Sequence, residues 1–118
     1  MSTKLWDVYI SGPMRGYEDL NRAAFTRASD LLTSKGLSVW NPCVDGLPDH
    51  LPPKLYIMHD IESLLNCRSI YMLDNWNMSL GANAEFHVAH WAEIPIFYEN
   101  DLNKLLPSKE FFEKCSQF

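Results

Sequence analysis

Residues 69–98 read SIYMLDNWNMSLGANAEFHVAHWAEIPIFY and contain the pattern strand, helix, strand. Ser69–Leu73 is an almost continuous apolar run, typical of a buried parallel strand. Ser79 can cap a helix that continues to about Ala92, and Ile94–Tyr98 predicts the next strand. Two strands joined by a helix form a right-handed crossover, so this segment predicts a parallel sheet covered by helices.

The rest of the chain continues this alternation. Apolar residues at helical spacing predict a helix between Tyr17 and Gly36, a glycine that suits the left-handed position at a helix end. A second helix is predicted at Leu55–Leu65 and a short third one after Ser108. Two further strands are predicted, at Asp7–Ser11 and Leu37–Trp40.

The stretch that follows Asn41-Pro42, to Pro53, is rich in proline and is expected to be irregular; connections of this length are often lids or binding loops. The whole pattern predicts one α/β domain over residues 1–118. We expect a Rossmann-like (flavodoxin-like) three-layer sandwich around a four- to five-stranded parallel sheet. In such sheets ligands bind at the carboxyl ends of the strands, near the point where the strand order reverses.

Composition narrows the class of function. The chain has 118 residues, a net charge of −5 and 47% hydrophobic residues, which excludes disorder and argues against binding a nucleic acid polymer. No apolar run is long enough for a membrane span, and the first residues do not resemble a signal peptide. The three cysteines lack paired spacing, so we expect reduced thiols in a cytoplasmic protein.

Packing alone does not explain why position 85 is a glutamate. It lies at the centre of the helix face that should pack on the sheet. The other residues of this face are small and apolar: Gly81, Ala82, Val88, Ala89 and Ala92. Because a carboxylate buried there without a partner is costly, Glu85 is expected to be a reactive group. The alternative is a structural carboxylate that accepts hydrogen bonds from a neighbouring turn.

Two segments near Glu85 have features of an anion site. Ser79 and Gly81 open the same helix, where free backbone N–H groups favour an anion, although Ser79 could be an ordinary N-cap. Four more candidates for phosphate binding lie where the first strand ends: Ser11, Gly12, Arg15 and Gly16. Glycine lets the backbone approach a ligand and arginine can hold phosphate with two bonds; the alternative is a turn with a solvated arginine. Neither segment matches a dinucleotide or triphosphate signature.

Two other side chains could act with Glu85. Tyr9 lies on the first strand, and its hydroxyl needs a partner that a carboxylate would supply. Asp60 lies on the flank of the second long helix, where it is either a second carboxylate of the same pocket or an ordinary boundary acid.

The predicted helix that contains Glu85 also contains two histidines and a second apolar stripe. His87 and His90 project away from Glu85 and lack further ligands, so no metal and no cofactor are expected. Leu80, Ala84 and Trp91 form a second apolar stripe on the same helix. This stripe is either core or a contact with a second copy of the chain.

The sequence resembles the nucleoside 2-deoxyribosyltransferase superfamily, in its small phage and bacterial branch close to the 2′-deoxynucleoside 5′-monophosphate N-hydrolases. The resemblance spans residues 8 to 98, in the expected order and spacing. Its stretches are Val8–Gly16, Asn41-Pro42, His59-Asp60-Ile61 with Leu64 and Cys67, and Ser79–Glu85 with Ala89.

The resemblance implies a homodimer that acts on a small-molecule nucleotide or nucleoside. Glu85 would be the nucleophile that attacks the anomeric carbon, and Tyr9 would orient it. Asp60 would assist departure of the base or activate water. Arg15, Ser79 and Gly81 would hold a 5′-phosphate. The expected activity is hydrolysis of the N-glycosidic bond. The alternatives are 2′-deoxyribosyl transfer to another base and a non-catalytic nucleotide-binding protein, a sensor or a sponge.

Overall fold

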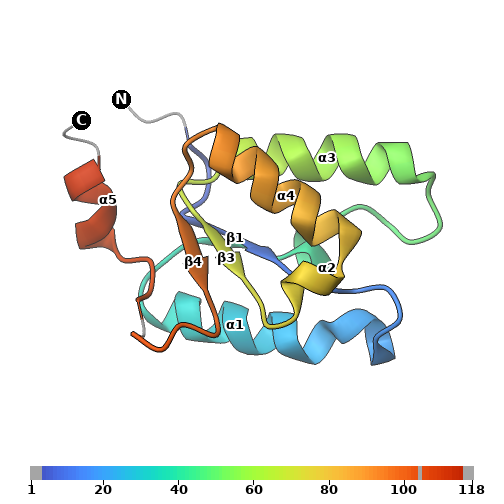
Figure 1. Cartoon of the computed structure of the whole chain (residues 1–118), viewed down its shortest axis with the longest axis horizontal. Helices are drawn as coiled ribbons and strands as arrows, with labels where there is room; N and C mark the ends of the chain where they lie inside the picture. The colour runs from blue at the N-terminus through green and yellow to red at the C-terminus, as the bar shows by residue number, and fades with distance from the viewer. Residues whose placement is uncertain (1–3, 104, 116–118) are drawn as a thin grey trace.

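Short buried strands and amphipathic helices assemble into an α/β sandwich around a four-stranded, all-parallel sheet, as expected from the sequence (Figure 1). The computed structural model describes residues 4–103 and 105–115. The sheet has the order β2-β1-β3-β4. Its strands are β1 (Val8–Ser11), β2 (Val39–Trp40), β3 (Ile70–Met72) and β4 (Ile96–Tyr98).

Helices cover both faces of the sheet. Helix α1 (Arg22–Ser34) lies on one face, and α3 (Pro53–Leu65) and α4 (Leu80–Trp91) lie on the other (Figure 1). The short helix α5 (Lys109–Cys115) follows at the C-terminal end, and its Phe112 is buried in the core cluster that includes Val8 and Phe25 (Figure 1). None of the described helices is long and apolar enough to cross a membrane.

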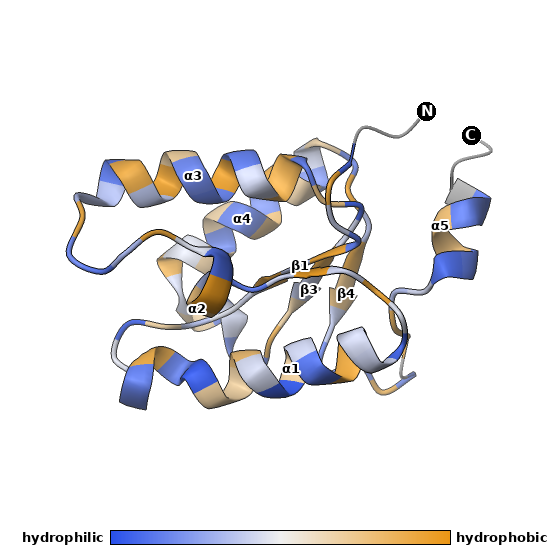
Figure 2. Ribbon diagram, turned by 180° about the vertical axis from the view of Figure 1, so that it is seen from behind, coloured by the Kyte–Doolittle hydropathy of each residue, from blue (hydrophilic) through white to orange (hydrophobic). Residues whose placement is uncertain are grey.

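The strands divide the core into two halves because successive side chains point to opposite faces. Val8 and Ile10 pack toward α1, together with Phe25 and Leu32 of that helix. Tyr9 packs toward α3 and α4, in a cluster with Trp40, Leu64, Met72 and Ala89. Figure 2 shows the strands as predominantly hydrophobic ribbons between helices of mixed character.

Two predicted boundaries were wrong. Helix α1 begins only at Arg22, because Glu18–Asn21 forms a 3-10 turn (η1) in which Asp19, Leu20 and Asn21 have positive φ angles. The Asn21 amide donates to the Pro13 carbonyl and ties this turn to the loop after β1. Within the predicted irregular segment, α2 (Pro42–Asp45) forms, since the Asn41 side chain accepts from the Cys43 N–H.

Several local predictions were confirmed. The Ser108 hydroxyl accepts from the Phe111 N–H at the start of α5, and Gly36 has a φ of 83° after α1. Cys67 is fully buried, and burial raises the pKa of its thiol to about 12, as suits an inert core residue. Cys115 lies in α5, and nothing is described of its side chain.

Asp7 anchors the C-terminal segment to the start of β1. Its buried carboxylate accepts from Lys109 Nζ at 2.6 Å and from the Ser38 N–H at 2.9 Å, and Arg68 Nε lies 3.8 Å away. Burial opposes ionisation of Asp7, but these hydrogen bonds and charges outweigh it and hold its pKa below the ordinary 3.8. Arg68 also lies over the Phe112 ring, at 5.8 Å, and so joins β3 to α5.

We expect Asp7→Asn to destabilise the fold by about 1 kcal/mol at neutral pH, since solvent screens the partly exposed Lys109 and Arg68. A lowered carboxyl pKa stabilises the native state above its unfolded value, and this contribution disappears as pH falls through the folded value. The difference in unfolding free energy between the variant and the wild type should therefore shrink as the pH is lowered from 7 to below 3.8, the ordinary pKa of the group. Urea denaturation along this series of pH values measures the difference, and a difference that stays constant would contradict the anchoring role of Asp7.

Candidate functional site

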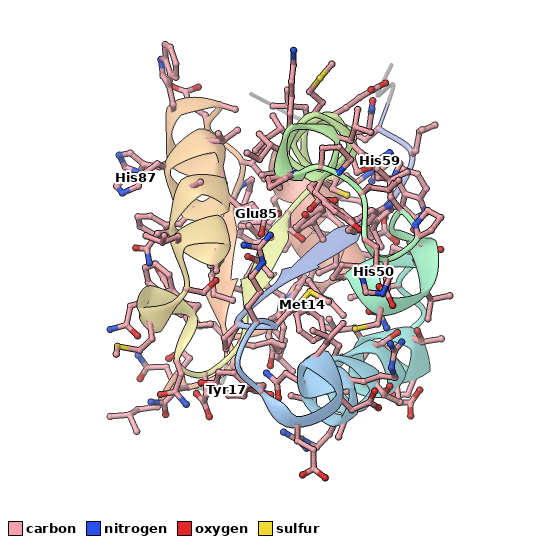
Figure 3. The ribbon with its side chains drawn as sticks, turned by 90° about the vertical axis from the view of Figure 1, so that its right-hand side faces the viewer. Met14, Tyr17, His50, His59, Glu85 and His87 are labelled. Atoms are coloured by element: carbon pink, nitrogen blue, oxygen red, sulfur yellow. The ribbon has the colours of Figure 1, made fainter. Side chains whose placement is uncertain are left out.

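Glu85 projects from α4 toward β1, and two hydroxyl groups of that strand hold its carboxylate (Figure 3). The Tyr9 hydroxyl donates to Oε2, and the Ser11 hydroxyl donates to Oε1 at 2.6 Å. Tyr9 and Ser11 are two residues apart on one strand, so their side chains lie on the same face of the sheet. The pairing fixes both oxygens of one carboxylate beside the end of β1.

The protein environment disfavours the charge on Glu85. Burial raises its pKa from the ordinary 4.5 to about 7; the hydrogen bonds from Ser11 and Tyr9 oppose this rise, and the charge of Asp60 adds to it. Burial and the nearby Glu85 charge also raise the pKa of Tyr9 well above 10. Tyr9 is therefore a hydroxyl donor throughout the neutral range, while Glu85 exchanges its proton within it.

Asp60 is the second carboxyl group of the site. It lies on α3, is partly buried, and interacts electrostatically with both Glu85 and Tyr9. Burial raises its pKa, and the neighbouring His59 lowers it in part. A carboxyl group with a raised pKa beside a second one has the arrangement of an acid and a nucleophile.

These groups lie at the position in the sheet where binding sites are expected. From β1 the chain crosses to β2 on one side, and later places β3 on the other, so the strand order reverses beside β1. Crevices at the carboxyl ends of the strands, next to this reversal, are the usual binding sites of open parallel sheets. The fold thus brings together Tyr9, Asp60 and Glu85.

The end of β1 and the loop that follows it contain four of the predicted phosphate ligands. The Ser11 hydroxyl donates to the Glu85 carboxylate in this structure. Gly12 is required for packing, because a Cβ there would lie 2.8 Å from the Leu73 Cβ. Gly16 has a φ of 83° and faces open space. Arg15 is exposed, and among residues 4–103 and 105–115 no group pairs with it, so its guanidinium is available to a ligand.

The start of α4 has the predicted geometry. The Ser79 hydroxyl accepts from the Ala82 N–H at 3.2 Å, which confirms the N-cap and leaves the hydroxyl proton available to a ligand. Gly81 is exposed, and the nearest atom to a Cβ built there is Ser79 Oγ, at 3.9 Å. Packing therefore does not require glycine at this position.

We expect Gly81→Ala to stabilise the fold by about 0.5–1 kcal/mol, because alanine is the better helix former and has room. If an anion approaches the N–H groups here, the added methyl group also weakens its binding. Urea denaturation and nucleotide titration of the same variant measure the two effects. Unchanged nucleotide affinity would exclude Gly81 from the binding surface.

Sequence reasoning missed the aromatic support of the site. The rings of Tyr9 and Trp40 are stacked, with centroids 4.7 Å apart and planes 5° from parallel, and this stack holds the Tyr9 hydroxyl in place. The His59 ring lies 6.0 Å from Trp40, and its buried Nε2 has no hydrogen-bond partner in the described part of the chain. No local pattern signals these contacts, since β2 and α3 meet only in the folded chain.

The two histidines of α4 lie away from Glu85. Figure 3 shows His87 on the opposite side of α4, and His90 stacks on Phe86 at 6.3 Å. Within the described ranges, no three residues of metal-binding type lie close enough to hold an ion.

Comparison with protein families matches residues 6–98 to the model of a domain of unknown function, DUF4406. The chain belongs to the DUF4406 family. The match contains Tyr9, Asp60 and Glu85 and ends with β4, so α5 lies outside the part that defines the DUF4406 domain. Neither the curated proteins nor the solved structures contain a significant match to this chain.

Proposed function

We propose that this DUF4406 protein is an N-glycosidase that hydrolyses the bond between base and sugar in (deoxy)nucleoside 5′-monophosphates in the cytoplasm. The observation that carries the proposal is the Glu85 carboxylate, held at both oxygens by Tyr9 and Ser11 with the Asp60 carboxyl beside it. Glycosidic cleavage passes through an oxocarbenium-like state that such a carboxylate stabilises.

In the first step, a Glu85 oxygen forms a bond to the anomeric carbon as the bond from that carbon to the base nitrogen breaks. The base leaves with the electron pair, and protonated Asp60 donates its proton to the base. The product on the enzyme is a glycosyl ester of Glu85. The raised pKa of Asp60 favours the protonated form that this step needs.

In the second step, water attacks the same carbon, Asp60 accepts the proton of the water, and the ester bond to Glu85 breaks. The sugar 5-phosphate is released and both carboxyl groups return to their starting states. The hydrogen bonds from Tyr9 and Ser11 make Glu85 a better leaving group here, because they stabilise its ionised form.

The 5′-phosphate would bind between the loop that follows β1 and the N-terminal end of α4. Arg15 would supply a charged fork, Ser79 would supply a hydroxyl, and the first backbone N–H groups of α4, near Gly81, would donate to the phosphate oxygens. Binding energy at the phosphate would position the sugar over the carboxylate.

The direct test is chromatographic detection of free base from a panel of nucleoside monophosphates and the matching nucleosides. Release from the monophosphates supports the hydrolase. A second free base in the same assay detects transfer, since exchange products would then appear in place of the free sugar phosphate. Nucleotide binding without release of any base would leave a binding protein and overturn the enzyme proposal.

The chain also has a surface suited to a second copy of itself. Leu80 and Trp91 are 93% and 89% exposed, so the second stripe on α4 is not part of the core. Helix α4 has no Lys, Arg or Asp, and its single Glu is turned toward the sheet. Two copies of a chain with a net charge of −5 could therefore meet here without like-charge repulsion. We propose a homodimer through this face.

We expect Leu80→Lys and Trp91→Lys together to convert the dimer to a monomer, because they bury four charges at the contact of two copies. Sedimentation equilibrium measures the change. Leu102→Lys, at a position that is also 93% exposed but outside α4, is the matched control. A dimer that persists in the double variant would exclude this face.

A further inference from the structure

A cavity of about 470 Å³ lies at the carboxyl ends of β3 and β4, and none of the residues that line it belongs to the Glu85 site. Its walls come from the connection between β3 and α4 and from the residues at the end of β4, with Asp74, Trp76, Asn77, Tyr98 and Asn100 among them. The volume is in the range of small-molecule sites. The cavity is therefore a second place where a ligand could bind.

One wall of the cavity is aromatic and well supported. One face of Trp76 stacks on Phe86 at 4.7 Å, and its ring lies 6.2 Å from that of Tyr98, tilted by 37°. The Asn83 side chain donates to the Asn77 carbonyl at 2.9 Å and to the Ser79 carbonyl at 2.8 Å, which ties this connection to α4. The rings of Trp76 and Tyr98 are both only partly buried, so part of their surface is open.

The polar side chains that line the cavity are acidic or neutral. Asp74 is the charged residue among them, and its backbone N–H donates at 3.0 Å to the carboxylate of Glu99, which lines the adjacent pocket together with Arg27. Among the described residues, neither carboxylate is in an ion pair, and no Lys or Arg lines the cavity. Burial, and to a smaller extent the charges of Glu99 and Asp74, raise the pKa of the neighbouring Tyr71 to about 12.

We propose that this cavity binds a small organic ammonium ion. Electron-rich aromatic faces attract such cations, and the two carboxylates attract their charge. The amide oxygens of Asn77 and Asn100 can accept the N–H groups of a primary amine. A phosphate would meet only like charge here, which separates this cavity from the anion site proposed beside Glu85.

The test is an NMR titration of the ¹⁵N-labelled full chain with 1,4-diaminobutane and with tetramethylammonium. We expect saturable shifts of the Trp76 indole N–H and of the backbone amides at 74–77 and at Asn100. tert-Butanol, a neutral molecule of similar shape to tetramethylammonium, should bind at least about five-fold more weakly. Equal binding of the alcohol would overturn the proposal, as would shifts scattered over the whole acidic surface.

The decisive variant is Asp74→Asn, at an exposed position whose side chain makes no hydrogen bond in the described part of the structure. It should weaken diaminobutane binding about five-fold, a typical effect of one partly screened charge. Glu93→Gln is the matched control, because it removes the same charge from an exposed position outside the cavity. Equal affinity of both variants would overturn the proposal. Glu85→Gln should bind the amine with wild-type affinity, because Glu85 does not line the cavity. The amine titration is therefore independent of the outcome of the glycosidase assay.

Discussion

Glu85→Gln should lower the rate of base release by at least about 10³-fold, the largest effect we expect of any single substitution. The glutamine side chain has nearly the same shape and can accept the Tyr9 hydrogen bond, but it cannot form the glycosyl ester. Nucleotide affinity should change little, because the proposed phosphate contacts come from Arg15 and the start of α4. Chromatography of released base and a binding titration on the same preparation separate the two effects.

Glu93→Gln is the control for this comparison, since Glu93 is exposed just after α4 and makes no contact with the site. Its rate should equal that of the wild type. The wild-type rate should also rise about tenfold per pH unit toward about pH 7, as the nucleophile ionises, and fall again where Asp60 loses the proton that it donates to the base. A Glu85→Gln variant that releases base at the wild-type rate would remove Glu85 from the reaction.

The stability difference between Glu85→Gln and the wild type should grow by about 3 kcal/mol between pH 4 and pH 8, in favour of the variant. The folded pKa of Glu85, about 7, lies above its ordinary 4.5, so the folded wild type binds more protons than the unfolded chain between these values. Wild-type stability therefore falls as pH rises through this window and is level above it. The amide of the variant does not titrate.

Urea denaturation of both proteins at each pH measures this difference. The other carboxyl groups contribute equally to the pH dependence of both proteins, so their contributions cancel in the comparison. Glu93→Gln, the same change of side chain at an exposed position outside the site, is the matched control. A constant difference for Glu85→Gln would mean that Glu85 titrates like a solvated carboxylate. This result would contradict the buried site without any assumption about the substrate.

The sequence was sufficient to predict which segments form strands and which form helices, because the signals for each element are local. The apolar run at Ser69–Leu73 contains β3, and Ser79 caps α4 through an N–H three residues away. Helical periodicity also placed Glu85 on the side of α4 that faces the sheet. Each of these inferences depends on residues that are close to one another in the sequence.

The same local signals were insufficient at the start of α1. The apolar stripe favoured a helix from the residues after Tyr17, but three successive residues there have left-handed φ angles. The contact of Asn21 with the Pro13 carbonyl, across the loop, accompanies this turn. A tertiary contact thus prevails over local helix propensity.

The sequence by itself determined that this chain is an α/β domain with a carboxylate on an apolar helix face. Only the tertiary structure decided what surrounds that carboxylate. Ser11 and Glu85 are 74 residues apart, and they meet because β3 lies beside β1 and places α4 over the end of that strand. The raised pKa of Glu85 has the same origin, since burial and the approach of Asp60 depend on strand order and helix packing. Strand order results from contacts summed over the whole core, so no local segment encodes it.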